Sequence, residues 1–191
     1  LDGTINVVGN DADSSATRQN EININGGNNE FIGNLIVGNN SGENTDLTLS
    51  GVNLAKNAQV GIAQAGKLIL TNDSTVNLNQ GDVVSGDIKL QDGTVNLDNY
   101  TLDTGDKSTQ EGGNQAYYSQ SGGILNLENN STLKLGDSGA MTGGDLKIDG
   151  TSQFLVTSEE NGTIYPTNFL DNLTINDGGR FGAMNGGFAD Y

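Results

Sequence analysis

Short apolar-polar-apolar triplets recur along this chain and are separated by stretches of Gly, Asn, Asp, Ser and Thr. Alternating apolar and polar residues are typical of a strand with one buried face, and the separating residues favour turns. No segment keeps a helical periodicity for more than one turn. The pattern therefore predicts an all-β chain built from many short strands.

The triplets come in pairs, and the pairs repeat. Each unit begins with Gly and continues with one triplet, a short turn and a second triplet. Most units start about 20 residues after the previous one, which is a period of solenoid proteins. The clearest units span residues 65–78, 85–97, 122–135 and 143–156, and the first apolar residues of successive units are Leu47, Leu68, Ile88, Leu125, Leu146 and Leu173.

One step in this series, from Ile88 to Leu125, is close to twice the basic step of about 20 residues. We therefore expect a degenerate unit between Tyr100 and Gln120, with residues 105–115 forming a projecting loop.

A unit of about 20 residues with two or three short strands predicts one coil of a parallel β-helix, or β-solenoid. Equivalent side chains then stack in columns from coil to coil. The inward columns are expected to place Leu68, Leu70, Val76 and Leu78 under Ile88, Leu90, Val95 and Leu97, while Lys67, Ile69, Asn77, Lys89 and Asn96 face outward. A core this narrow explains how a chain with 33% hydrophobic residues can fold.

With 191 residues, the chain fits a single β-solenoid domain over residues 1–191. Within it we expect irregular N-terminal coils or a cap at 1–45, a loop insertion at 98–121, and a C-terminal coil, cap or assembly tail at 157–191. The chain starts at Leu1 without a signal segment, and we interpret it as a portion of a longer product or an expression fragment.

Thr and Asn are placed regularly within the units. Stacked Asn and Thr side chains can hydrogen-bond between neighbouring coils, as they do in cross-β stacks. Their alternative roles are to satisfy turn backbones or to form a regular face for ice or glycan, and the lack of a strict Thr-x-Thr array favours the turns. These residues are Thr75, Thr94 and Thr132, which precede second strands, and Asn72, Asp73, Asp92, Asn129 and Asn130, which lie in turns.

Charge and composition exclude several classes of function. The chain has 8 Lys and Arg against 24 Asp and Glu, a net charge of -16, no His and no Cys. A Ser-His-Asp triad, a Cys nucleophile, Cys/His metal sites and disulfides are therefore excluded. The negative charge disfavours nucleic acid and anionic lipid as partners, and no apolar run is long enough to insert into a membrane.

The Gly-Gly-x-Leu-x-Leu units followed by Ser/Thr-x-Leu-x-Leu resemble the passenger domains of Gram-negative autotransporter adhesins over most of residues 46–181. The resemblance implies a right-handed parallel β-helix displayed outside the cell, with a role in adhesion, autoaggregation or biofilm formation. The protease insertion that some members carry has no counterpart in this sequence, and neither has the family's translocating barrel.

Polysaccharide-active β-helix enzymes form an alternative class. A hydrolase needs paired carboxylates facing one cleft, and a lyase needs acidic Ca²⁺ ligands with an Arg or Lys base. The available candidates are Arg18 and Arg180, near the two ends, and the pairs Asp11 with Asp13 and Asp103 with Asp106. Such pairs are common in a chain with 24 acidic residues, so we predict that the protein is not an enzyme and has no catalytic residues.

No cofactor is expected. Weak Ca²⁺ binding in acidic turns stays open because oxygen ligands are abundant. Gly143-Gly144-Asp145 is only a fragment of the calcium-binding nonapeptide, so no ligand set can be named.

Aromatic residues gather in two places that we treat as candidate interaction sites. Tyr100, Tyr117 and Tyr118 flank the expected loop, where they form a glycan-stacking patch or cover the apolar side of the loop. Phe181, Phe188 and Tyr191 lie near the C-terminus, where they cap the last coil or dock on another subunit or a further coil.

The sequence thus predicts a non-enzymatic structural or adhesive segment of a bacterial surface protein, located outside the cell. Its partners would be further copies of itself, or a glycan or protein of a host or cell surface. The alternatives are a filament subunit that stacks end to end and, third, a polysaccharide-active enzyme.

Overall fold

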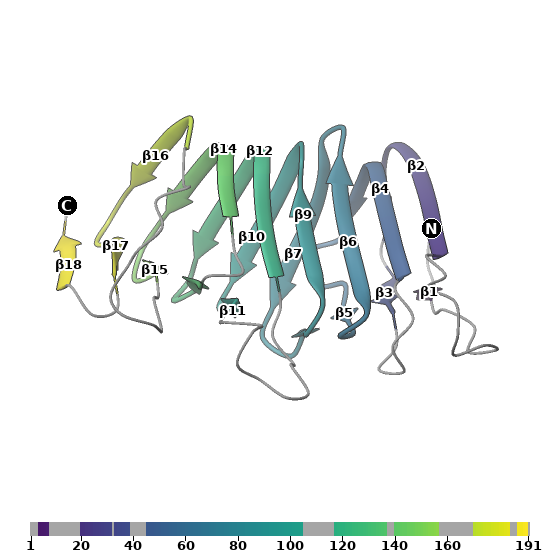
Figure 1. Ribbon diagram of the computed structural model, residues 1–191, viewed down its shortest axis with the longest axis horizontal. Helices are drawn as coiled ribbons and strands as arrows, with labels where there is room; N and C mark the ends of the chain where they lie inside the picture. The colour runs from purple at the N-terminus through teal and green to yellow at the C-terminus, as the bar shows by residue number, and fades with distance from the viewer. Residues whose placement is uncertain are drawn as a thin grey trace.

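A computed structural model describes residues 4–7, 20–31, 33–38, 45–104, 117–136, 140–156, 170–183 and 187–190. Every regular element in these ranges is a β-strand, which confirms the all-β prediction (Figure 1). No helix among these residues is long and apolar enough to cross a membrane. The strands are β1 (Thr4–Val7), β2 (Asn20–Phe31), β3 (Asn34–Val37), β4 (Thr45–Leu54), β5 (Val60–Ile62), β6 (Gly66–Thr71), β7 (Ser74–Asn79), β8 (Val83–Val84), β9 (Asp87–Leu90), β10 (Gly93–Asp98), β11 (Thr101–Thr104), β12 (Tyr117–Glu128), β13 (Thr132–Leu135), β14 (Ala140–Ile148), β15 (Gln153–Val156), β16 (Asn172–Ile175), β17 (Arg180–Ala183) and β18 (Gly187–Asp190).

The strands form three sheets. An N-terminal sheet has the order β1-β3-β5-β8, and a C-terminal sheet has the order β11-β13-β15-β17-β18. The main sheet contains the other nine strands, and Figure 1 shows them following one another along the long axis of the molecule. Strand pairing among the described residues is parallel, except for the antiparallel pair β17–β18.

The main sheet has two halves, one that contains β6 and β9 and one that contains β7 and β10. Two long, bent strands, β4 and β12, join these halves. The first part of β4 pairs with β6, and its end pairs with β7. The first part of β12 pairs with β9, and its second part pairs with β10. The pairings β4-β6-β9-β12-β10-β7 therefore close into a ring of six strands.

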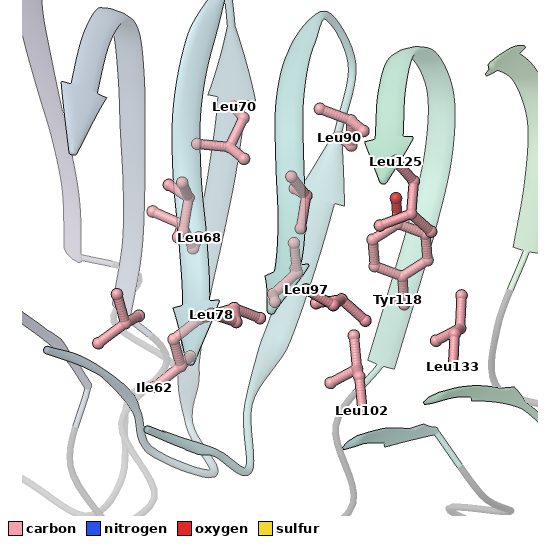
Figure 2. Packing of buried hydrophobic residues seen from close by; sticks show 14 of the residues in the cluster. Ile62, Leu68, Leu70, Leu78, Leu90, Leu97, Leu102, Tyr118, Leu125 and Leu133 are labelled. Carbon is pink, nitrogen blue, oxygen red and sulfur yellow. The ribbon is translucent and has the colours of Figure 1, made fainter. Parts of the chain in front are cut away.

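The predicted stacking between the units 65–78 and 85–97 is confirmed. Leu68 pairs with Ile88 and Leu70 with Leu90, where β6 meets β9. Val76 pairs with Val95 and Leu78 with Leu97, where β7 meets β10. All eight side chains are buried, and Figure 2 shows members of this core side by side inside the strands.

The unit 122–135 is displaced from its predicted position. Leu125 pairs with Val95 and therefore does not continue the column of Leu68 and Ile88. That column continues instead through Tyr118, the partner of Ile88. The triplets are so alike that they do not specify which half of the main sheet they join. The degenerate unit expected between Tyr100 and Gln120 is represented by β11 and by the start of β12, whereas the loop expected at 105–115 lies outside the described residues.

The predicted regions at the two ends contain strands that continue the stack. Residues 1–45 include β1, β2 and β3, and β2 pairs in parallel with β4. Residues 157–191 include β16, β17 and β18, of which β16 pairs with β14 and β17 with β15.

Glycine is required where the chain bends between β9 and β10 and, within β12, between its two halves. Gly93 and Gly123 have φ values of 121° and 71°. A Cβ atom on Gly93 would lie 2.3 Å from the carbonyl oxygen of Ser74, and one on Gly123 would lie 2.5 Å from that of Gly93. Glycine at these two bends therefore permits the close approach of neighbouring strands.

Most residues predicted to face outward do so, since Lys89 is exposed and Lys67, Ile69 and Asn96 are half-buried. Asn77 differs, because it is buried with 8% exposure. Its side-chain amide donates to the carbonyl oxygen of Leu54 over 3.0 Å and its side-chain oxygen accepts from Asn96 over 2.8 Å, so its polar groups are satisfied without water.

Candidate functional site

Successive turns along the main sheet form a polar edge that we call the corner ridge. It consists of the turns after β7, β10, β12, β14 and β16, which are residues 80–82, 99–100, 129–131, 149–152 and 176–179. These strands pair in this order, so their turns lie next to one another.

The backbone of the corner ridge explains its Asn, Asp and Gly content. Asn99, Asn129, Asn130 and Asp177 have φ values between 49° and 65°. This left-handed region is unfavourable for most side chains, and Asn, Asp and Gly tolerate it best. Turn geometry therefore accounts for the residue types found there, as the turn interpretation of Asn129 and Asn130 predicted.

Next to the corner ridge, Asp98 of β10 contacts Lys56, which follows β4, and Asn129, which follows β12. Its carboxylate lies 2.8 Å from Lys56 Nζ and accepts a 2.7 Å hydrogen bond from Asn129 Nδ2. These two donors, Lys56 first, lower the pKa of Asp98 below its usual value. Lys56 itself is 70% exposed, so the ion pair is largely screened by solvent.

Asp82 ties the first turn of the corner ridge to its surroundings. Its Oδ1 accepts a 2.9 Å hydrogen bond from the backbone of Val60, and its Oδ2 accepts one of 2.7 Å from Asn79. Desolvation of the half-buried carboxyl raises its pKa and outweighs the opposite effect of the two hydrogen bonds.

Two shallow hollows lie along this edge, and Lys56 helps to line the first of them. The first has a volume of about 420 Å³ and the second about 440 Å³. Their walls are rich in amide and carboxylate groups, which suits hydrogen bonding to a polar partner. The first is lined by residues 56–59 and 79–82, and the second by residues 128–130 and 149–151.

No group of three or more Asp, Glu, His or Cys side chains that could hold a metal ion occurs in the part of the chain that the structure describes. Weak Ca²⁺ binding therefore gains no ligand set and stays a prediction.

The carboxylates considered for catalysis are only partly placed. Asp103 lies 3.0 Å from Lys134 Nζ in an ion pair across β11 and β13. Arg180 begins β17 in the C-terminal sheet. The remaining candidates lie outside the described residues: Asp11, Asp13, Arg18 and Asp106.

The three tyrosines near the expected loop have different environments. Tyr118 is fully buried, and its hydroxyl donates to Gln120 Oε1 over 3.0 Å. Tyr100 is half-buried against the core, and this burial raises its pKa. Tyr117 is half-buried in β12. Only Tyr100 and Tyr117 therefore keep exposed surface.

Phe181, the first of the three C-terminal aromatic residues, packs against the end of the hydrophobic core. Its ring stacks on that of Phe154 with centroids 5.0 Å apart and an angle of 3° between the planes. Phe188 lies in β18, opposite Gly182 of β17. Tyr191 is outside the described residues.

No family model, curated protein or solved structure matches this chain. The resemblance to autotransporter passenger domains therefore rests on the sequence units alone.

Sequence reasoning missed Lys56 and Asp82 as residues of this edge. The only signal for Asp82 was its turn composition, Asn-Gln-Gly-Asp over residues 79–82. Lys56 carried no local signal, because its partner Asp98 is distant in the sequence and becomes close only through the stacking of strands.

Proposed function

We propose that this chain is a right-handed parallel β-helix that serves as a non-enzymatic structural and adhesive segment of a bacterial surface protein. The observation that carries the proposal is a column of apolar residues that stays in register over four strands and is buried in the first three of them. Val95, Leu125, Leu146 and Leu173 pair in sequence across β10, β12, β14 and β16. A stack held in register by both backbone and side chains resists bending, which suits a spacer.

The corner ridge is the adhesive part of this proposal. It presents carboxylate, amide and hydroxyl groups at regular intervals and contains the two hollows. A glycan or a polar protein surface would find repeated donors and acceptors there. Because the chain carries a net charge of -16, it would repel its own copies at low salt, and neutralising cations or acid would promote association.

Surface display tests the adhesive role. The chain is displayed on non-adherent cells, and binding to a glycan array, to host cells and to one another is measured. We expect display to raise adhesion, Lys56→Gln beside the hollows to reduce it, and Lys89→Gln on β9 to leave it unchanged. Adhesion and aggregation equal to those of undisplayed cells would contradict the proposal. Small-angle X-ray scattering of the same chain should give an elongated profile.

A filament subunit is the second candidate, and the end of the main sheet favours it. β16 ends the strand order of that sheet. Leu173 of β16 is 43% exposed, although its column partner Leu146 is fully buried. Another strand placed on β16 would cover this side chain. Electron microscopy distinguishes the two: fibres that Leu173→Asn abolishes support the filament, and separate short rods support the spacer.

A further inference from the structure

Among aspartyl sequences, aspartate followed by glycine is the most prone to spontaneous backbone rearrangement, because glycine leaves the next amide unhindered. Four Asp-Gly pairs occur in this chain, and three lie in the described residues: Asp92-Gly93, Asp149-Gly150 and Asp177-Gly178. The first two share the same following residue, since both read Asp-Gly-Thr. Any difference between these two must therefore come mainly from the fold.

The two Asp-Gly-Thr turns differ in how the reacting groups are held. The amide nitrogen of Gly150 lies 2.8 Å from Oδ1 of Asp149, which brings it next to the carboxyl carbon of the same residue. Holding two groups at contact distance is what accelerates an intramolecular reaction. Among the described Asp-Gly pairs, this is the one in which the glycine amide donates a hydrogen bond to the side chain of the preceding aspartate.

The two Asp-Gly-Thr turns also differ in how much free space surrounds them. Asp149 is exposed, and no atom would lie within 4 Å of a Cβ on Gly150, so a ring has room to form. Gly93 is buried at the start of β10, and a Cβ there would lie 2.3 Å from the carbonyl oxygen of Ser74. The backbone of Gly93 is therefore packed against the neighbouring strand, which opposes the shift that ring closure at Asp92 requires.

Asp177-Gly178 is exposed but has a different backbone. Asp177 has a φ of 49°, in the left-handed region, whereas Asp149 is not among the residues with positive φ. The hydrogen bond in that turn runs from Gly179 to the carbonyl oxygen of Asn176, so it does not involve the carboxylate of Asp177.

From these contacts we propose that Asp149-Gly150 is a site of spontaneous covalent modification, at which the folded protein converts aspartate to isoaspartate. The amide nitrogen of Gly150 bonds to Cγ of Asp149, and the carboxyl OH leaves as water with the amide proton, which gives a five-membered succinimide. One water then opens the ring. Attack at Cγ restores aspartate, and attack at the main-chain carbonyl carbon leaves Gly150 joined through Cγ. No oxidant or other co-reactant is consumed. The site does not depend on the proposed function.

The modification would alter the corner ridge. Asp149 now donates its amide to the carbonyl oxygen of Leu127 over 2.9 Å and accepts from Ser152 over 3.2 Å. Isoaspartate adds one carbon to the main chain between β14 and β15, so these two hydrogen bonds cannot both keep their geometry. The second hollow, which Asp149, Gly150 and Thr151 help to line, would change shape with them.

Prolonged incubation of the intact, folded chain in mildly acidic buffer at growth temperature tests the proposal. Peptides containing each Asp-Gly pair are then separated, and isoaspartate is located by electron-transfer fragmentation. We expect isoaspartate to accumulate several-fold faster at Asp149 than at Asp92 or Asp177. An equal or slower rate at Asp149 in the folded protein would overturn the proposal.

Two controls show whether the fold is the cause. In concentrated urea, Asp92 and Asp149 should react at similar rates because their local sequences match, and persistence of the native ratio in urea would also overturn the proposal. Asp149→Glu lengthens the side chain by one carbon and prevents the five-membered ring. This variant should lose the product at position 149 and keep the slow rate at Asp92.

Discussion

The side-chain amide of Asn126 donates a 2.7 Å hydrogen bond to the side-chain oxygen of Asn96, on the neighbouring strand of the main sheet. Asn96 donates in the same way to Asn77 over 2.8 Å, and Asn77 donates to the carbonyl oxygen of Leu54. We call these three residues the asparagine ladder. Each side-chain amide donates to an oxygen atom on the neighbouring strand that precedes it in the sequence, so the hydrogen bonds of the ladder run in one direction across four strands.

Breaking the middle of the asparagine ladder should destabilise the protein. Asn96→Ala leaves the Asn77 oxygen and the Asn126 amide without their partners, and we expect a loss of about 1–2 kcal/mol in the free energy of unfolding. Urea unfolding at neutral pH measures it, with exposed Asn176→Ala as the control. A loss no larger than that of the control would show that water replaces the ladder without cost.

The bend glycines should not tolerate a side chain. Gly123→Ala places a Cβ 2.5 Å from the carbonyl oxygen of Gly93, and we expect a destabilisation of about 2 kcal/mol or more. Gly150→Ala is the matched control: Gly150 has a similar φ of 61° but open space around it. For Gly150→Ala we expect only the destabilisation caused by backbone strain, about 1 kcal/mol. Equal losses in thermal or urea unfolding would rule out the steric explanation.

The Asp98 carboxylate should make stability depend on pH. Its pKa is lowered in the folded protein, mainly by Lys56, so its contribution is present at neutral pH and is lost as the pH falls through its folded pKa. We expect the stability advantage of the wild type over Asp98→Asn to shrink on acidification. Chemical unfolding at a series of pH values measures this advantage.

Asp82 provides a contrast within the same experiment. Burial raises its folded pKa, so protonation favours the folded state. The wild type should therefore gain stability relative to Asp82→Asn as the pH falls. The same direction of change for both variants would contradict the assignment of one carboxyl as desolvated and the other as paired.

Tyr118 should make the protein sensitive to alkali. Burial raises its pKa, so the unfolded chain loses the phenol proton first, and stability falls as the pH rises above the ordinary tyrosine value of about 10. Tyr118→Phe leaves Gln120 Oε1 without its donor, which costs about 1 kcal/mol at neutral pH, but should show a smaller alkaline loss. Phenolate absorbance of Tyr118 that appears before unfolding would contradict this account.

The stacked pair Phe154–Phe181 should stabilise the C-terminal end locally. Phe181→Ala removes half-buried apolar surface and a ring contact, and we expect a loss of about 2 kcal/mol confined to β15 and β17. Hydrogen-exchange mass spectrometry should show faster exchange there and unchanged protection in β6 and β9. Phe181→Leu, which keeps an apolar side chain, should have a smaller effect.

The sequence predicted the packing of β6 on β9 and of β7 on β10 correctly because those units follow each other without interruption. It misplaced Leu125 because a Leu-x-Leu triplet carries the same signal wherever it lies in the sheet. Tyr118 and Gln120 occupy positions that Ile88 and Leu90 hold on the neighbouring strand. A glutamine in an apolar column can be buried only because Tyr118, Gly123 and Asp145 satisfy its amide, and a one-dimensional pattern does not reveal such contacts.

The candidate site was less predictable than the fold. Turn residues such as Asn129 were recognised from composition, since Asn tolerates the backbone that the turn requires. The contact of Lys56 with Asp98 depends on how many residues each turn contains, and the sequence pattern does not specify this.

The register of β6 on β9 and of β7 on β10 has a consequence for how the chain can change in length. A tandem copy of residues 67–86 would place each duplicated Leu in register between apolar residues of the neighbouring strands. The apolar columns and the asparagine ladder would continue through the copy, whereas Ser74 would stand at the bend where Gly93 now follows it. Gene duplication or deletion of whole units can therefore lengthen or shorten such a protein while its apolar columns are kept, and the bend between the strands is the place where an added unit needs a substitution to glycine.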